Sequence, residues 1–525
     1  MSKLKEKGFS KFGFIISSIG SAIGLGSVWR FPWLMERNGG GGFLIPYFIC
    51  MIFIGIPLLM FEINVGSYFK KAQSLYYSKD KKTRIFGYMF FSVCLMIQTF
   101  YAVVIAYLFI QLLQSVAHIF GSESFGFTKG LISGDDNNPP IVKVADGVNF
   151  KTLGGISWPI LGALTFILLF VAFVSTFEIA KGVEKLNKIC IPALFVLFTF
   201  LTIYSMTLKG AEKQLEKMWA PKWAEAFTFK AWTDAASITL FSLSLGMGPI
   251  WYYSSQTEKT QDPHNSAFVI ALPLILVSLL AGIINYSSLG FLESNGVDIE
   301  KLPKSGGSLV FVTYPKVFVA LGEQTGAPWF AGIIGLMFFL SLIFASITSL
   351  ISLTEVCVGN LKTAFTKFSR SKLSLMTTIL VFILAIPYTL KSGLNLVDGT
   401  DFWTSNVSIF VLVIGNLIFV VILGTKEWIQ AREFANKNSW IKIPYKWITI
   451  ALMVSGVILL ALFGIVTYNS FIKVLIDKWE ENWFKILLFG IIWGVIIKIA
   501  MSSILSYFTT TKKFGNKEEV EGVQQ

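Results

Sequence analysis

The chain has 525 residues, of which 54% are hydrophobic and 14% are charged, and its mean hydropathy is +0.66. Soluble domains carry about 25% charged residues, so this composition excludes an ordinary soluble protein and indicates a membrane protein throughout. The net charge of +13 does not point to nucleic acid, because the basic residues cluster in short segments between apolar runs. Two histidines, and four cysteines at no metal-ligand spacing, leave little for metal or triad chemistry.

Apolar runs near 20 residues recur along the chain, and each is long enough to cross a bilayer as a helix. They predict an all-α polytopic membrane protein with twelve transmembrane helices. The expected spans are 12–36, 41–69, 87–117, 157–176, 189–208, 233–256, 266–293, 328–361, 373–390, 400–424, 446–468 and 484–508. An even number of spans places both termini on one side of the membrane.

The distribution of lysine and arginine predicts which side that is. Segment 70–84 holds six basic residues against one acid, and it faces the same side as both chain ends. Basic loops near 181–188, 362–372 and 426–446 fall on that side too, whereas the opposite loop 118–156 is mixed or mildly acidic. We therefore expect an inner-membrane protein whose N-terminus (1–11) and tail (509–525) are cytoplasmic. The charged start runs directly into the first span, so no cleavable signal is expected.

Two of the predicted spans carry helix-breaking residues in mid-membrane. The first reads GSAIGLGSVWRFP over 20–32, and the second, five helices later, reads TLFSLSLGMGPIWYY over 239–253. Interrupted spans at corresponding positions of two halves indicate inverted repeats with a binding site between them. We expect five-helix repeats over 12–208 and 233–424, followed by two further helices within 446–508.

Unwound backbone at membrane depth is tolerated only where protein or a water-filled cavity satisfies it. A half-helix that begins near Gly26 offers free N–H groups and a positive dipole end, and both suit a carboxylate. Carbonyls released between Gly20 and Ile23 suit a hard cation such as sodium. The alternative is that Gly20 and Gly24 serve close helix packing. Packing explains one interrupted span, but it explains two at corresponding positions poorly.

Several motifs, in their order and spacing, make the chain resemble the neurotransmitter:sodium symporter family, in particular its bacterial amino-acid transporters. The resemblance covers nearly the whole chain. The motifs are GSAIGLGSVWRFP (20–32), NGGGGFLIPY (38–47), GIPLLMFEINVG (55–66), FSLSLGMG (241–248), LLAG (279–282), FASITSL (344–350) and DFW (401–403). The resemblance implies a five-plus-five inverted-repeat fold with helices 1 and 6 unwound. It also implies sodium-coupled uptake by alternating access.

The second sodium site of that family is complete at the matching positions of this chain. The resemblance implies an all-oxygen shell, as a hard cation needs, made of the carbonyls of Gly20, Ile23 and Ala345 and the hydroxyls of Thr348 and Ser349. The alternative is that the two hydroxyls merely bond back to their own helix.

The family's first sodium site and its chloride site are where this chain departs from the pattern. Ser27 stands where the family usually has Asn, and Leu274 stands where it has Asn or Asp, so we expect the first sodium site to be absent or weakened. Tyr47, Ser242 and Ser278 of the chloride site are retained, but Ile238 and Leu274 replace amide side chains. The expectation is one sodium ion and no specific chloride site.

The matching substrate pocket carries no acidic side chain, because Gly24 stands where monoamine carriers place one. An acid-free pocket suits a ligand with its own carboxylate and a neutral, hydrophobic side chain. The expected pocket residues are Ala22, Gly24, Leu25, Gly26, Ile97, Tyr101, Phe241, Ser244, Met247, Ser349 and Leu353. For Ile97, Met247 and Leu353 taken singly, ordinary core packing is the favoured explanation.

Charged residues within spans are costly and usually functional. Arg30 and Asp401 match the family's extracellular gate pair. Glu62 and Glu355 lie toward the cytoplasmic ends of their spans, where they serve as structural or inner-gate acids or, alternatively, couple a proton. The counterparts of the family's inner gate pair are Lys5 and Thr363, and these residues cannot form a salt bridge.

Three other classes of protein, namely sensors, enzymes and channels, fit the sequence less well than a transporter. A substrate-binding sensor, or a carrier of another small zwitterion, would share the same pocket. An enzyme is not expected, because Ser244, Thr348 and Ser349 have no histidine partner in mid-span. A channel would have no use for the gate pair Arg30 and Asp401. Besides sodium, the expected partners are an amino acid and the lipid bilayer, with no nucleic acid.

Overall fold

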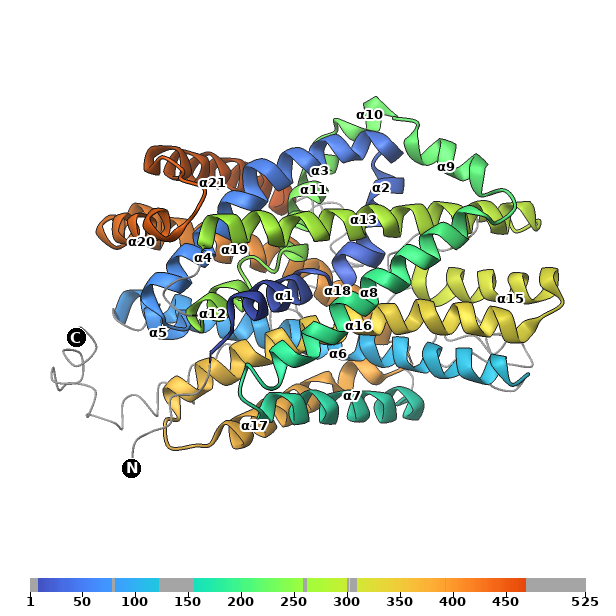
Figure 1. Cartoon of the computed structure of the whole chain (residues 1–525), viewed down its shortest axis with the longest axis horizontal. Coiled ribbons are helices and arrows are strands. Elements are labelled where there is room, and N and C mark those ends of the chain that lie inside the picture. Colours follow the sequence, from blue (N-terminus) through green and yellow to red (C-terminus); the bar gives the residue numbers. More distant parts are fainter. Residues whose placement is uncertain are drawn as a thin grey trace.

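The computed structural model describes residues 8–77, 81–121, 155–257, 262–299, 302, 309–391 and 393–468. This part of the chain is helical apart from loops and two isolated β-bridges. Its long helices run side by side along the longest axis of the molecule (Figure 1). The predicted twelfth span (484–508) and the tail lie outside the described residues.

The first five predicted spans are helical as expected. The first consists of α1 (Lys11–Ala22), the π-helical turn η1 (Gly26–Arg30) and α2 (Phe31–Arg37). The second consists of η2 (Gly40–Phe43), α3 (Leu44–Cys50), η3 (Met51–Gly55) and α4 (Ile56–Phe69). The next elements are α5 (Gln73–Tyr77), α6 (Lys81–Ile119), α7 (Trp158–Thr176) and α8 (Val183–Met206).

The second half begins after two short helices, α9 (Ala211–Trp219) and α10 (Trp223–Ala226). The sixth span is split into α11 (Phe229–Ser242) and α12 (Pro249–Ser255), and α13 (Pro263–Ser294) is the seventh. The eighth to eleventh spans and their connections are η6 (Leu309–Thr313), α15 (Tyr314–Thr325), α16 (Pro328–Ala364), α17 (Arg370–Ala385), η7 (Ile386–Thr389), α18 (Gly393–Trp403), η8 (Thr404–Ser408), α19 (Ile409–Asn416), η9 (Leu417–Ile422), α20 (Thr425–Asn438) and α21 (Tyr445–Thr467).

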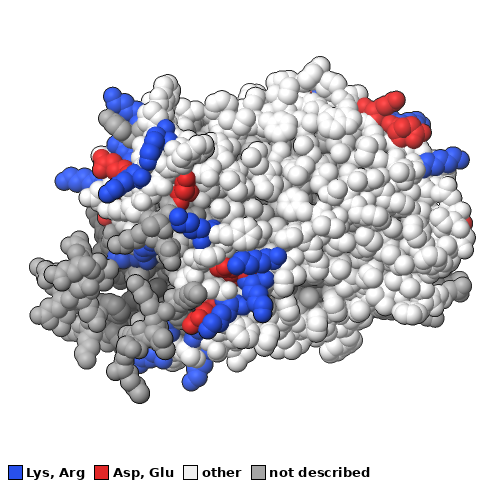
Figure 2. Space-filling view, in the orientation of Figure 1, with Lys and Arg blue, Asp and Glu red and all other residues white. Residues whose placement is uncertain are grey.

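The lengths and apolar character of these helices fit a bilayer. Within the described residues, nine helices are long and apolar enough to cross a membrane, and the bent pair α1 and η1–α2 makes a tenth span. Figure 2 shows Lys, Arg, Asp and Glu gathered at the two ends of the visible face, with a broad uncharged band between them. Such a band, flanked by charge, is what a membrane slab requires.

Two of the predicted basic loops are in fact helical. The fifth span begins at Val183 instead of 189, and much of 426–446 forms α20. The loop prediction near 181–188 was wrong because charged residues ended the apolar run there, although Glu and Lys are good helix formers. Lys188 lies one turn after Glu184 and pairs with it at 2.7 Å, which supports this extra helical turn. The boundaries of the two repeats stay a prediction.

The first interrupted span breaks where its glycines predict. Ser10 begins α1 as its N-cap, and its hydroxyl accepts the Gly13 N–H at 2.9 Å. The helix ends at Ala22, the chain bends by 46°, and a π-helical turn restarts at Gly26. Ala22 and Gly26 are both buried, so the break lies inside the protein rather than in lipid.

The second interrupted span breaks between Ser242 and Pro249, also as predicted. Its backbone enters the left-handed region at Ser244 (φ 55°), Gly246 (φ 72°) and Gly248 (φ 108°). Glycine adopts this region freely, whereas for Ser244 it costs about 1–3 kcal/mol, which the surrounding structure must offset. Strained residues of this kind gather at functional sites.

Candidate functional site

The two breaks lie against each other in the protein interior. The Ser244 hydroxyl donates to the Ser21 carbonyl at 2.8 Å and accepts from the Ser21 hydroxyl at 3.2 Å. Ser21 belongs to the last turn of α1, so this contact joins the two interrupted spans across 223 residues of sequence. The strained backbone at Ser244 is therefore what aims its hydroxyl at the first break.

A small cavity lies at this junction. Its volume is about 20 Å³, and it is lined by Ser21, Ala22, Gly24, Gly26, Ile97, Tyr101, Phe241, Ser242, Ser244, Met247, Ser349 and Leu353. Ten of the eleven expected pocket residues are in this lining. The remaining one, Leu25, reaches Tyr101 through its main chain. Two of the lining residues, Ser21 and Ser242, were not among the expected ones.

One end of the cavity is polar because two glycines bring the backbone close to side-chain hydroxyls. A Cβ atom on Gly24 would lie 2.7 Å from the Tyr101 Oη and 2.8 Å from the Ser349 Oγ, so no larger residue fits. The Leu25 N–H donates to the Tyr101 Oη at 3.2 Å. At Gly26, a Cβ would lie 2.8 Å from the Phe241 ring. This end offers hydrogen-bond donors with no fixed charge.

Another part of the cavity lining is apolar. Ile97 from α6, Met247 from the second break and Leu353 from α16 are each at most 4% exposed. Phe241 from α11 is half-buried and packs against this core. A polar end and an apolar wall in one cavity match the two ends of a small amphipathic molecule.

The residues expected to bind sodium meet beside the first break, except that no described contact involves the Ile23 carbonyl. The Thr348 Oγ1 lies 2.9 Å from the Gly20 carbonyl, 3.0 Å from that of Phe344 and 3.0 Å from that of Ala345. The Ser349 Oγ lies 3.2 Å from the carbonyls of Gly20, Ser21 and Ala345. The hydroxyls therefore bond back to their own helix and also reach α1.

This cluster gathers two hydroxyl oxygens and four carbonyl oxygens between α1 and α16. Each hydroxyl carries one proton, yet Thr348 and Ser349 each lie within hydrogen-bond distance of three carbonyl oxygens. The surplus lone pairs converge in a buried place, because Thr348 and Ala345 are fully buried and Ser349 is 7% exposed. Carbonyl and hydroxyl oxygens gathered away from water, each with a further lone pair, are the donor set that a sodium ion fits.

The positions of the first sodium and chloride sites look different. Leu274 is fully buried and brings no side-chain oxygen, and Ile238 is 1% exposed. The Tyr47 hydroxyl contacts the Ser278 Oγ at 3.5 Å, and Ser278 in turn donates to the Leu274 carbonyl at 3.0 Å. These retained residues thus bond to one another and to their own helix.

The two residues of the predicted gate pair lie near each other, beside the cavity. The Arg30 Nη1 lies 3.7 Å from the Asp401 Oδ2, and the guanidinium stacks 5.7 Å from the centre of the Phe241 ring. Asp401 also accepts from the Ser405 hydroxyl at 2.9 Å. Since Phe241 lines the cavity, Arg30 lies next to the site.

The two inner acids have separate partners. Glu62 accepts the Gly246 N–H at 2.8 Å and so holds the second break, whereas Glu355 pairs with Arg370 at the start of α17. Arg370 also donates to the carbonyls of Ser175 and Phe177 at 3.1 and 2.6 Å. Lys5 and the side chain of Thr363 lie outside the described residues.

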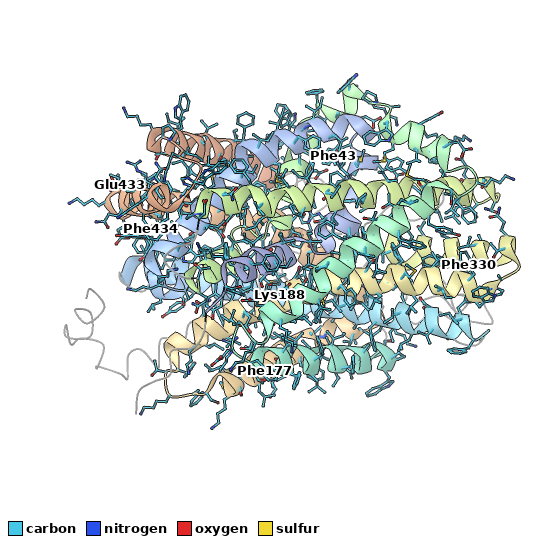
Figure 3. All side chains as sticks on the ribbon, viewed as in Figure 1. Phe43, Phe177, Lys188, Phe330, Glu433 and Phe434 are labelled. Atoms are coloured by element: carbon cyan, nitrogen blue, oxygen red, sulfur yellow. The ribbon has the colours of Figure 1, made fainter. Side chains whose placement is uncertain are left out.

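Sequence reasoning missed a contact at the N-terminal end of α1. Glu184 from α8 accepts the Ser10 N–H at 3.1 Å and the Ser10 hydroxyl at 2.7 Å. Lys188, which Figure 3 labels, pairs with Glu184 at 2.7 Å. A carboxylate at the N-terminus of a helix is favoured by the helix dipole. The sequence predicts a loop at 181–188. Without a helix there, it gives no indication of which side chains face α1, and the contact of Glu184 with α1 could not be predicted.

Comparisons with known proteins agree with this geometry. The model of the sodium:neurotransmitter symporter family matches residues 5–124 and 140–510. An uncharacterised sodium-dependent transporter of Methanocaldococcus jannaschii is 33% identical over 461 residues, which cover 87% of this chain and 89% of that protein. A second one, YhdH of Bacillus subtilis, is 28% identical over 453 residues, covering 83% and 92% of the two chains.

A solved structure shares the fold. The crystal structure of MhsT in complex with L-phenylalanine matches with a TM-score of 0.70 and 25% identity, over 87% of this chain and 99% of that one. The predicted fold class, twelve helices in two repeats with the first and sixth spans unwound, is thereby confirmed.

Proposed function

Since the chain belongs to the sodium:neurotransmitter symporter family, a family of transporters and not of enzymes, we propose that it is a sodium-coupled symporter of a neutral, hydrophobic amino acid. The observation that carries the proposal is the cavity between the two breaks, which has a polar main-chain end, an apolar wall and no charged lining residue. A zwitterion brings its own charges to such a site.

The amino acid lies across both breaks. Its carboxylate accepts from the main-chain N–H groups of Leu25 and Gly26 and from the Tyr101 hydroxyl, at the positive end of the second half-helix. Its ammonium faces Ser244 and the carbonyl of Phe241. Its side chain lies against the apolar wall, and the bound phenylalanine of MhsT is consistent with a side chain of this kind.

The cavity must widen to admit this cargo. A volume of about 20 Å³ leaves room for roughly one water molecule. The cargo enters when Arg30 and Asp401 separate, and it leaves when α1 moves away from α8, which breaks the Ser10–Glu184 contact. Both termini are cytoplasmic in this cycle, and the chain resides in the inner membrane.

One sodium ion drives the cycle, at the oxygen cluster of Gly20, Ile23, Ala345, Thr348 and Ser349. The first sodium site is weakened by Ser27 and Leu274, and no specific chloride site is formed. One charge moving across 100 mV is worth about 2.3 kcal/mol, or roughly 50-fold accumulation from voltage alone. A second ion would roughly square that factor.

The test is a binding scan of the twenty amino acids on the purified full-length protein, in sodium and in choline. We expect tight binding of one or a few aliphatic or aromatic amino acids in sodium only. Binding that is equal in choline, or that is confined to charged amino acids, would contradict the proposal. Counterflow in proteoliposomes then separates a carrier, which exchanges its labelled cargo, from a sensor, which does not.

A further inference from the structure

Helix α8 approaches the first interrupted span unusually closely, and glycines of α1 make this possible. A Cβ on Gly13 would lie 2.0 Å from the Glu184 carboxyl group. A Cβ on Gly20 would lie 2.0 Å from the Asn187 Oδ1 and 3.2 Å from the Ile191 Cδ1. The Asn187 amide therefore lies directly against the backbone of Gly20, just before the break.

The orientation of the Asn187 amide is fixed by its own helix. Its Nδ2 donates to the Val183 carbonyl, one turn earlier, at 2.8 Å. A flipped amide would point its oxygen at that carbonyl and lose the bond, so the oxygen faces Gly20. Asn187 is fully buried, and its Oδ1 has no hydrogen-bond partner among the described residues.

A buried acceptor without a partner is destabilising, so its place in the fold calls for a reason. The residue that it touches is Gly20, whose carbonyl lies 2.9 Å from the Thr348 Oγ1 and 3.2 Å from the Ser349 Oγ. The orphaned oxygen thus lies against Gly20, the residue whose carbonyl belongs to the oxygen cluster, and it comes from a third helix. An amide oxygen is a hard ligand of the kind that sodium accepts.

We propose that the amide oxygen of Asn187 is a further ligand of the sodium ion bound between α1 and α16. This inference rests on the proposed function, because it needs a sodium ion at that cluster. The ion then links three helices rather than two. Its binding also holds α1 against α8, one turn from the place where Glu184 already caps the start of α1.

The experiment measures the equilibrium binding of radioactive sodium, with no amino acid present, to the purified full-length protein in detergent. Asn187→Leu keeps the side-chain volume and removes the oxygen, so we expect roughly ten-fold weaker sodium binding. Asn187→Ala leaves space for a water that can replace the oxygen, so its loss is smaller. Asn187→Asp adds a negative charge at the same place and binds sodium several-fold more tightly.

Asn285 provides a matched control. It is a buried amide of α13 whose nitrogen and oxygen both lack partners within the described residues, and it belongs to no expected sodium or substrate position. Asn285→Leu should leave sodium affinity unchanged, because it removes an equivalent side chain away from the oxygen cluster. Melting temperatures in choline show that each variant is folded before its affinity is compared.

Thr348→Ala separates failure of this inference from failure of the proposed function. If Thr348→Ala weakens sodium binding while Asn187→Leu and Asn187→Asp leave it unchanged, the role of Asn187 is overturned and the sodium site stands. If the unaltered protein binds no sodium, the proposed function fails as well. Should Asn187→Leu not fold, Asn187→Asp decides alone, and an unchanged affinity in that variant overturns the inference.

Discussion

The two breaks are alike in sequence pattern but differ in what stabilises them. At the first, the freed groups contact hydroxyls of other helices: Tyr101 accepts from the Leu25 N–H, and Thr348 lies at the Gly20 carbonyl. At the second, a buried carboxylate takes the Gly246 N–H, and left-handed residues fix the path of the chain. Hydroxyls can exchange their partners for a ligand, whereas a glutamate bonded to a strained turn cannot easily do so.

This difference assigns separate tasks to the two breaks. In the proposed function, the first break supplies the sodium ligands and the groups that bind the carboxylate, and the second break positions Ser244 and Met247 in the same cavity. The contact between Ser21 and Ser244 joins them. The two halves of the fold thus share a topology, but the residues that stabilise their breaks are of different kinds.

The largest effect is expected when both hydroxyls beside the first break are removed. The double variant Thr348→Ala, Ser349→Ala deletes two of the five expected sodium ligands, so sodium-stimulated uptake should be lost. The measurement is uptake into proteoliposomes in sodium and in choline. The control is Ser346→Ala, because the Ser346 hydroxyl bonds only to its own helix, at 2.7 Å from the Leu342 carbonyl. Unchanged uptake in the double variant would mean that the ion lies elsewhere.

At the second break, removing the whole Glu62 side chain should have a larger effect than removing only its charge. Glu62→Ala leaves the Gly246 N–H without its partner and should cost about 1.5–3 kcal/mol of stability, with a large loss of uptake. Glu62→Gln keeps an oxygen for that N–H and should retain most of the stability. Thermal melting and uptake measured on both variants test this. Equal losses in the two variants would show that the charge of Glu62, not its hydrogen bond, is what matters.

Adding a methyl group at the first break should affect the cargo more than the ion. In Gly24→Ala the new Cβ lies 2.7 Å from the Tyr101 Oη, at the polar end of the cavity, so amino-acid affinity should fall by more than about ten-fold, or 1.4 kcal/mol. Sodium binding should weaken less, because the new Cβ also lies 2.8 Å from the Ser349 Oγ, but Ser349 is only one of the five expected sodium ligands. The control is Gly162→Ala in α7, where a Cβ meets nothing within 4 Å. An equal loss of sodium binding would show that the two sites are not separable.

The smallest effect is expected at the extracellular gate. Asp401 is 27% exposed and its oxygen lies 3.7 Å from Arg30, so the pair contributes about 0–1 kcal/mol. Asp401→Asn should weaken apparent amino-acid affinity a few-fold. Glu225→Gln removes an exposed pair with Lys222 at the same 3.7 Å distance and should have no effect. If uptake falls as much in Glu225→Gln as in Asp401→Asn, the proposal that Arg30 and Asp401 act as a gate is contradicted.

The spans, both breaks and most of the cavity lining could be predicted from the sequence, because length, hydropathy and glycine placement act locally. The structure adds features that depend on tertiary contacts. The left-handed backbone of Ser244 accompanies its bonds to Ser21, and serine alone does not signal it. The roles of Glu184 and Asn187 depend on the approach of α8 to Gly13 and Gly20, which no span prediction contains.

The measurement that tests the central claim most directly is the ratio of sodium to amino acid moved in one cycle. Proteoliposomes are loaded with neither solute, and radioactive sodium and a labelled amino acid chosen from the binding scan are followed together at fixed voltage. One sodium ion per amino acid is the predicted result, abolished by the double variant of Thr348 and Ser349. A ratio of two, or amino-acid uptake with no accompanying sodium, would contradict the account.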